Sequence, residues 1–184
     1  MRNNKKILTL ALGRRGGSVR YGTSIIDSFV HNKEVFASSF CTEKIPFNAK
    51  KIPTYKNKFQ FILSSLFVLP ALWIYVVYGL LRGKYCAFYS PYTYYWNMLF
   101  VYTFKCFKIK TILTIHDGIP HTGDGNKWER VINYNSIIHS NELIFLTNHV
   151  YHYLKSKINF SALSHIIPHG PISIDGVDYK KFDI

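Results

Sequence analysis

The stretch Lys110-Thr-Ile-Leu-Thr-Ile-His116-Asp117-Gly118-Ile-Pro120-His121-Thr-Gly123 decides the fold class. A β-branched apolar run stops directly at two ionisable residues, and a loop rich in glycine and proline follows. This order is typical of a buried strand that ends where open α/β sheets bind their ligands. It also fits a strand end whose polar residues merely cap the next helix, so the motif alone leaves both interpretations open.

Outward from this strand, apolar runs alternate with segments of helical periodicity. The predicted strands are Lys5–Leu12, Glu34–Ser39, Tyr85–Tyr89, Lys110–Ile115, Glu142–Leu146 and His165–Ile167. The predicted helices are Tyr21–His31, Pro91–Phe107, Asn126–His139 and Asn148–Lys157, and the stretch Cys41–Asn57 is predicted to be a basic loop. This alternation predicts an α/β fold, a single Rossmann-like domain over residues 1–184 with helices on both faces of a parallel sheet.

Composition and charge narrow the class of partner. The chain has 184 residues, of which 48% are hydrophobic, so it can bury a core and is not disordered. Residues 1–58 hold 12 Lys and Arg against 3 Asp and Glu, within a formal net charge of +13. Such a basic region indicates an anionic partner or simply a solvated surface. No nucleic-acid recognition motif accompanies the charge, so we expect no nucleic-acid partner.

The three cysteines and the N-terminal residues point to the cytoplasm. Cys41, Cys86 and Cys106 form no Cys-x-x-Cys pair and no disulfide framework, which fits a reducing compartment. The first apolar run, Ile7–Leu12, is too short for the core of a signal peptide. No His-Glu-x-x-His, Asp-x-Asp or phosphate-loop motif occurs, so we expect neither a bound metal nor ATP hydrolysis.

The segment Phe59–Leu81 contains 23 residues and no charge. It is long enough to span a bilayer, which takes about 20 apolar residues. Three interpretations remain open: a spanning helix, a helix buried on the sheet, and a helix packed on the sheet with part of its surface in the membrane interface. We favour the third, because strands on both sides of the segment should share one sheet. Nearby lysines at 50, 51, 56 and 58 suit anionic headgroups.

The order of motifs resembles the N-terminal, acceptor-side domain of GT-B glycosyltransferases, especially the retaining enzymes of the family 4 type. The motifs are Gly16-Gly17 after the first strand, Thr114-Ile-His116-Asp117 with Pro120-His121, Leu143-Ile-Phe-Leu-Thr147-Asn148, and Ile166-Ile-Pro168-His169-Gly170. They extend over essentially the whole chain. The resemblance implies a transferase that moves a sugar from a nucleotide-sugar donor, with no further cofactor, to a membrane-associated glycan or lipid-linked acceptor in cell-surface polysaccharide synthesis.

The resemblance also assigns site residues. Gly16 and Gly17 would approach the phosphates of the sugar donor, because glycine permits close contact with the backbone. His116 and Asp117 would be catalytic, with His116 near the donated sugar. Substrate contacts would come from Arg20, which suits a phosphate, and from His121, Thr147, Asn148 and His169. The rival interpretations are solvent exposure for Arg20 and loop structure for His121 and His169.

The chain departs from the family in one large respect. GT-B enzymes bind most of the nucleotide sugar in a second domain, which in family 4 carries a Glu-x7-Glu motif. No two glutamates here are eight positions apart. We therefore expect the isolated chain to be inactive and to need a donor-binding domain, for example on a separate polypeptide. We expect it to act peripherally on the cytoplasmic face of the cell membrane. The alternative is a non-catalytic, membrane-associated subunit or truncated remnant that docks a partner protein.

Overall fold

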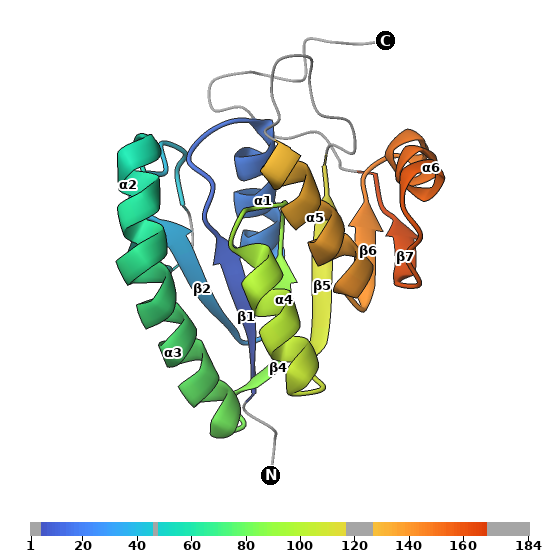
Figure 1. Ribbon diagram of the computed structural model, residues 1–184. Coiled ribbons are helices and arrows are strands. Elements are labelled where there is room, and N and C mark those ends of the chain that lie inside the picture. The colour runs from blue at the N-terminus through green and yellow to red at the C-terminus, as the bar shows by residue number, and fades with distance from the viewer. Residues whose placement is uncertain (1–4, 46–47, 117–126, 169–184) are drawn as a thin grey trace, which may run out of the picture.

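The computed structural model describes residues 5–45, 48–116 and 127–168, and its centre is a parallel sheet (Figure 1). Within the described residues the sheet has seven strands, in the spatial order β3 (Lys50–Ile52), β2 (Lys33–Ser38), β1 (Lys6–Ala11), β4 (Tyr85–Ser90), β5 (Lys110–Ile115), β6 (Glu142–Phe145) and β7 (Leu163–Ile166). Every strand pairing is parallel. The predicted α/β fold class is confirmed.

Helices cover both faces of the sheet. They are α1 (Gly17–Ser28), α2 (Lys58–Leu63), α3 (Leu69–Leu81), α4 (Asn97–Cys106), α5 (Lys127–His139) and α6 (Asn148–Lys157), with a π-helical turn at Ser64–Val68 between α2 and α3. Figure 1 shows α1 behind the sheet, and α2, α3, α4 and α5 in front of it. The helix α1 contributes Val19 and Ile26 to the core on its face, while α3, α4, α5 and α6 contribute to the larger core on the other face.

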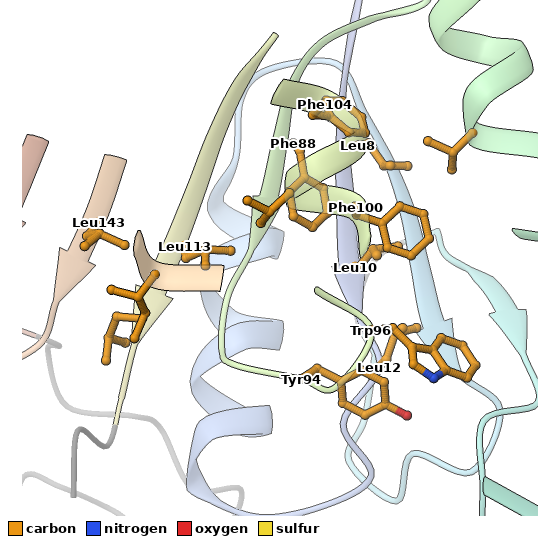
Figure 2. Packing of buried hydrophobic residues seen from close by; sticks show 14 of the residues in the cluster. Leu8, Leu10, Leu12, Phe88, Tyr94, Trp96, Phe100, Phe104, Leu113 and Leu143 are labelled. Atoms are coloured by element: carbon orange, nitrogen blue, oxygen red, sulfur yellow. The ribbon is translucent and has the colours of Figure 1, made fainter. Parts of the chain in front are cut away.

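Strand β1 shows why the sheet is covered twice. Leu8, Leu10 and Leu12 point into the larger core, where Phe88 and Phe100 also lie (Figure 2). The alternate residues point toward α1, because successive side chains of a strand face opposite sides. Leu8 and Leu10 are fully buried, and each such burial contributes about 1.5–3 kcal/mol. An apolar run without alternation therefore becomes a central strand of a parallel sheet.

The segment predicted at Phe59–Leu81 is one continuous helix from α2 through α3, which we call the long helix. Its π-helical turn precedes Pro70, whose missing amide N–H interrupts the regular hydrogen-bond ladder. Leu72, Val76, Gly79 and Leu80 are buried against the sheet. By length and composition the helix is sufficient to cross a membrane, yet only 17% of its apolar window is buried in the protein.

Several predicted boundaries were wrong. The helix expected at Tyr21–His31 begins four residues earlier, at Gly17, and the last strand begins at Leu163. The stretch expected as a basic loop contains β3, whose pairing with Phe36–Ser38 makes it an edge strand. Exposed lysines there hide the strand pattern, although charge is common on sheet edges. The helix expected from Pro91 begins at Asn97 instead. The preceding residues turn inward, and the Asn97 side chain donates hydrogen bonds to the Tyr92 carbonyl and the Ser90 hydroxyl, at 3.0 Å each.

Candidate functional site

A crevice opens at the carboxyl ends of β1 and β4. The loop after β1 leads into α1 on one face of the sheet, whereas the loop after β4 leads into α4 on the other. Open α/β sheets bind ligands at such a switch point. The crevice has a volume of about 350 Å³. Its lining residues are Gly13, Arg14, Arg15, Ser18, Val19, Tyr55, Tyr92, Thr93, Tyr94, Tyr95 and Glu129.

The N-terminus of α1 borders the crevice through Ser18 and Val19. Gly16 precedes the helix with φ of +106°, in the left-handed region that favours glycine. No side chain in the described parts of the chain caps this helix. A Cβ added at Gly16 or Gly17 would meet no atom within 4 Å. Open amides at a helix N-terminus suit an anion, and the free space lets one approach the backbone.

Tyr92 fixes the shape of the crevice by joining its two loops. Its hydroxyl accepts a hydrogen bond of 2.9 Å from the Gly13 amide. A Cβ at Gly13 would lie 3.1 Å from the Tyr92 ring, and one at Gly22 would lie 2.7 Å from it. Because both glycines leave room for this ring, the loop after β1 and the helix α1 are held at a set distance from the loop after β4.

Arg14 places a positive charge in the crevice wall. Its Nη1 donates a hydrogen bond of 2.9 Å to the Lys56 carbonyl, and its Cζ lies 5.7 Å from the centre of the Tyr55 ring. The Thr42 amide donates to the Arg14 carbonyl at 2.9 Å. Arg15, which is exposed, also lines the crevice and adds a second positive charge beside it. Two guanidinium groups beside an uncapped helix N-terminus favour a phosphate-bearing ligand.

Tyr95 and Glu129 form the opposite, acidic wall. The Tyr95 hydroxyl donates a hydrogen bond of 2.9 Å to Glu129 Oε2. Burial and this contact with the carboxylate raise the pKa of Tyr95, so the phenol stays protonated at neutral pH. Aromatic faces and carboxylate oxygens are suited to the apolar faces and hydroxyl groups of a sugar.

His116 ends β5 and packs against α1. Its ring centre lies 4.5 Å from that of Tyr21, and the two ring planes meet at 79°. Tyr21 is buried, and burial raises the pKa of its phenol. His116 therefore contacts the same helix that begins at Gly16 and Gly17, about one turn along. It is not among the described residues that line the crevice.

Arg20 is held by a neighbouring acid. Its Nε donates to Glu43 Oε2 at 2.8 Å, and about half of its side chain is exposed. A surface pair of this kind contributes about 0–1 kcal/mol, so an incoming phosphate can compete for the guanidinium group. Arg20 lies outside the lining of the crevice, whereas the nearby Arg14 and Arg15 belong to it.

The remaining predicted residues lie elsewhere or outside the described chain. The Thr147 hydroxyl caps α6 by accepting a hydrogen bond of 3.2 Å from the Val150 amide, and Asn148 is exposed at the first position of that helix. Asp117, His121 and His169 lie outside the described residues. In residues 5–45, 48–116 and 127–168, no three His, Cys, Asp or Glu side chains gather as a metal site would require. The assigned roles of all these residues stay predictions.

Most of the crevice was not predicted from the sequence. The glycines after β1 were predicted to be site residues, but the arginines beside them were not, and the aromatic run after β4 was predicted to be helical. A usable signal was present, because residues that directly follow strands β1 and β4 must meet at the same edge of a parallel sheet. Glu129 gives no such signal, since only the packing of α5 brings it to the crevice.

Comparison with known proteins shows the fold. No protein-family model and no curated protein matches the chain. Among solved structures, Anabaena HepE in complex with UDP and glucose matches 90% of this chain and 45% of its own, with a TM-score of 0.61 at 15% identity. Sucrose-phosphate synthase from Thermosynechococcus elongatus matches 91% of this chain and 48% of its own, with a TM-score of 0.59 at 10% identity.

A third structure extends the likeness to a plant protein. Phytolacca americana UGT2, complexed with UDP-2-fluoro-glucose and pterostilbene, matches 94% of this chain and 55% of its own, with a TM-score of 0.58 at 7% identity. The chain thus spans about half the length of each of these three structures. These structures are GT-B glycosyltransferases, and this chain has the Rossmann-like fold of one half of that architecture.

Proposed function

We propose that this chain is the acceptor-side domain of a glycosyltransferase that transfers a sugar from a nucleotide-sugar donor at a membrane surface. The crevice between β1 and β4 is the observation that carries the proposal. It is lined by two arginines and by a wall of tyrosines with a carboxylate, and it is bordered by the N-terminus of α1, where Gly16 and Gly17 leave the backbone open to an anion. Two of the matching structures contain UDP with glucose or UDP-2-fluoro-glucose, which supports a nucleotide sugar as the donor here.

Transfer of a glycosyl group leaves negative charge on the diphosphate of the donor. Gly16, Gly17 and the first turn of α1 would stabilise that charge through backbone amides, which need no reorganisation during the reaction. His116 would approach the donated sugar from the end of β5. A second domain, on this or another polypeptide, would hold the nucleotide. The isolated chain should therefore bind nucleotide sugars only weakly.

The outer side of the long helix supports action at a membrane. Every exposed residue between Phe59 and Leu81 is apolar or aromatic, and these residues are Phe59, Ile62, Leu63, Leu66, Phe67, Pro70, Ala71, Trp73, Ile74, Tyr75, Tyr78 and Leu81. We call this set the outer apolar face. A continuous apolar surface of this length on a soluble protein marks a contact with a membrane or with another protein.

The polar side chains of the same segment are hydrogen-bonded within the protein. Gln60 accepts a hydrogen bond of 2.7 Å from the Lys56 amide, and Ser65 accepts one of 3.2 Å from the Trp96 indole. The Ser64 hydroxyl donates to the Thr54 carbonyl. None of these groups interrupts the outer apolar face, so the segment satisfies its polar groups within the protein. This arrangement favours an apolar medium outside the helix.

An interfacial position suits the helix better than a spanning one. Its inner side packs on the sheet through Leu72, Val76 and Leu80, and crossing a bilayer would strip that side from the core. Lys51, Lys56 and Lys58 are exposed near the start of the helix and suit anionic headgroups at about 1 kcal/mol each. Lys50 contributes less, because its Nζ lies 2.6 Å from Glu34 Oε1. We propose a peripheral position on the cytoplasmic leaflet.

The acceptor-side assignment is tested by amide NMR of the full chain in detergent micelles. UDP and inorganic diphosphate should shift the amide signals of Gly16, Gly17 and Ser18, whereas uridine should not. The variant Gly17→Val should abolish these shifts while its other signals stay in place, since its side chain would occupy the open space above the helix N-terminus. Equal shifts with uridine, or diphosphate shifts confined to other regions, would contradict the assignment and favour a non-catalytic docking subunit.

A further inference from the structure

A second pocket lies at the end of the long helix that is remote from the crevice. Its volume is about 320 Å³, and its lining residues are Tyr75, Tyr78, Gly79, Arg82 and Lys84. Figure 1 shows that α3 ends near the amino ends of the strands, whereas α1 begins near their carboxyl ends. The volume lies within the range of ligand pockets, about 300–1000 Å³. We call this pocket the α3 end pocket.

The backbone ends α3 without help from the two basic side chains of the pocket. Gly83 has φ of +66°, in the left-handed region that favours glycine. The Gly83 amide donates a hydrogen bond of 2.9 Å to the Leu80 carbonyl. The Lys84 amide donates one of 2.9 Å to the Gly79 carbonyl. Because these bonds satisfy carbonyls that a helix end otherwise leaves open, the side chains of Arg82 and Lys84 are not needed as caps and can bind a ligand.

Tyrosine rings position both cations at the wall of the pocket. Arg82 Cζ lies 4.9 Å from the centre of the Tyr78 ring, and Lys84 Nζ lies 4.9 Å from that of Tyr75. Lys84 Nζ also donates a hydrogen bond of 2.9 Å to the Tyr75 hydroxyl. A cation over an aromatic face gains about 0.5–1 kcal/mol at an exposed site. The two charges are thus held in place before a ligand binds, which lowers the entropic cost of binding.

Positive charge around the pocket exceeds negative charge. Lys84 Nζ lies 2.6 Å from Glu34 Oε2, and Lys50 Nζ lies 2.6 Å from Glu34 Oε1. Within the described residues, Arg82 has no acidic partner, and Glu34 is the only carboxylate that pairs with the two lysines. Three cations therefore share one carboxylate. An anion in the α3 end pocket would balance part of the excess charge.

The α3 end pocket also borders the outer apolar face. Tyr75 and Tyr78 line the pocket and belong to that face, and Leu81 in the last turn of the helix is 70% exposed. A phospholipid can place its phosphate between Arg82 and Lys84 while its acyl chains lie along the outer apolar face. A free phosphate would use only the polar part of this arrangement, so the surroundings of the pocket favour a lipid.

We propose that the α3 end pocket binds the phosphate group of an anionic phospholipid, with Arg82 and Lys84 in contact with the phosphate. This inference rests on the proposed membrane position of the long helix, but it uses a site remote from the crevice. Lys51, Lys56 and Lys58 lie near the start of the helix, so basic groups are present at both of its ends. The long helix is therefore held parallel to the membrane plane, with both ends at headgroup level.

The test is a titration of the full chain in nonionic detergent micelles, followed through the amide NMR signals of Gly79, Gly83 and Lys84. Four ligands are compared: dihexanoyl phosphatidylglycerol, dihexanoyl phosphatidylcholine, glycerol phosphate and inorganic phosphate. Phosphatidylglycerol should shift these signals to saturation. The other three should bind weaker by about tenfold or more, because phosphatidylcholine carries its own cation and the two soluble anions lack acyl chains.

Two variants with the same change in charge separate the pocket from general attraction. Arg82→Gln should lower the affinity for phosphatidylglycerol by about tenfold, as expected for a lost charge-assisted contact. Lys58→Gln removes an exposed charge at the other end of the 24-residue helix. That end is about 36 Å away, so the affinity should change by less than about twofold. Arg82→Lys should restore part of the affinity, because it keeps the charge without the planar fork. Thermal unfolding checks that each variant is folded.

The outcomes separate this site from the proposed function. Equal affinity for inorganic phosphate or glycerol phosphate would overturn a phospholipid as the ligand, and equal losses in Arg82→Gln and Lys58→Gln would overturn the pocket as its site. Absence of shifts with phosphatidylglycerol, in a chain that floats with anionic vesicles, would overturn the inference and leave the membrane position standing. A chain that does not float with these vesicles would overturn both. The response of Gly16 and Gly17 to diphosphate, which tests the glycosyltransferase assignment, is independent of all these results.

Discussion

The helix α1 and the long helix cover the same strands from opposite faces, yet they present opposite surfaces outward. Both bury apolar side chains against the sheet, for example Ile26 of α1 and Val76 of the long helix. The exposed side of α1 carries polar residues, among them Arg20, Ser24 and Asp27, whereas the exposed residues of the long helix between Phe59 and Leu81 are all apolar or aromatic. Packing on the sheet requires apolar residues only on the inner side of each helix. The residues on the outer side therefore indicate whether that side contacts water or an apolar medium.

The largest expected effect on membrane binding comes from placing charged residues on the outer side of the long helix, which makes it resemble the outer side of α1. Ile62→Glu combined with Ile74→Glu places two charges on the outer apolar face, where the side chains are 55% and 63% exposed. Each substitution removes about 1.5–3 kcal/mol of apolar transfer, so affinity for anionic vesicles should fall by roughly a thousandfold in a flotation assay. Thermal stability should be unchanged. Ser24→Glu on α1 is the control and should bind almost as well as the unchanged protein.

The next effect concerns how the long helix is held to the sheet. Glu34 is 7% exposed and accepts hydrogen bonds from Lys50, Tyr75 and Tyr85, at 2.6, 2.7 and 2.5 Å. Lys84 Nζ forms an ion pair with Glu34 Oε2 at a distance of 2.6 Å. Glu34→Gln should lower the free energy of unfolding by about 3 kcal/mol, measured by urea denaturation, because it leaves a buried ion-pair network incomplete. A loss below about 0.5 kcal/mol, as for ordinary surface changes, would contradict this view.

The same cluster gives a pH dependence with a defined sign. Burial raises the pKa of Glu34, but its hydrogen bonds from Lys50, Lys84, Tyr85 and Tyr75 outweigh burial and lower the pKa from 4.5 to about 2. The folded state therefore binds the proton less readily than the unfolded state. Its stabilising contribution is present above pH 4.5 and is lost as pH falls toward 2. Glu34→Gln should flatten this part of the stability profile.

A smaller effect tests the attachment of α1. Gly22→Ala would place a Cβ 2.7 Å from the Tyr92 ring and 3.1 Å from Pro91, so it should destabilise the protein by about 1–3 kcal/mol through overpacking. Gly17→Ala on the same helix meets no atom within 4 Å and should be neutral or slightly stabilising. Chemical denaturation of both variants measures the contrast. Equal stability of the two would show that Tyr92 does not set the distance between the crevice loops.

The smallest effect concerns single lysines beside the long helix. Lys56→Gln should weaken binding to anionic vesicles by about 1 kcal/mol, because an exposed charge near the surface is lost. Lys50→Gln should weaken it less, since that lysine is paired with Glu34. Raised salt should reduce the difference between the variants. If both variants lose the same vesicle affinity in a co-sedimentation assay, the ion pair with Glu34 does not reduce the contribution of Lys50 to membrane binding.

The sequence predicted the sheet better than the site, for a physical reason. Central strands such as β1 and β5 are apolar on both faces, and that pattern is local in sequence. The edge strand β3 carries lysines and is short, so its pairing with β2 is a long-range event without a local signal. The crevice likewise depends on which loops the strand order brings together. Glycines after β1 gave a local cue, whereas Glu129 reaches the crevice only through packing of α5.

The outer apolar face also needed the structure. The polar residues Gln60, Ser64 and Ser65 lie within the otherwise apolar segment. Their side chains are hydrogen-bonded to Lys56, Thr54 and Trp96, and none of the three residues belongs to the outer apolar face. Periodicity could not reveal this, because the π-helical turn at Ser64–Val68 shifts the helical register in the middle of the segment.

Fluorescence quenching by brominated lipids tests most directly whether the outer apolar face lies in the membrane interface. A protein with Trp96→Phe and Trp128→Phe keeps Trp73, which is 37% exposed on that face. A second protein adds Trp73→Phe and Ser24→Trp, which moves the reporter to the outer side of α1. On anionic vesicles, Trp73 should be quenched most by lipids brominated near the headgroup, and the reporter on α1 should not be quenched. Equal quenching of the two reporters, or deepest quenching of Trp73 at the bilayer centre, would contradict an interfacial long helix.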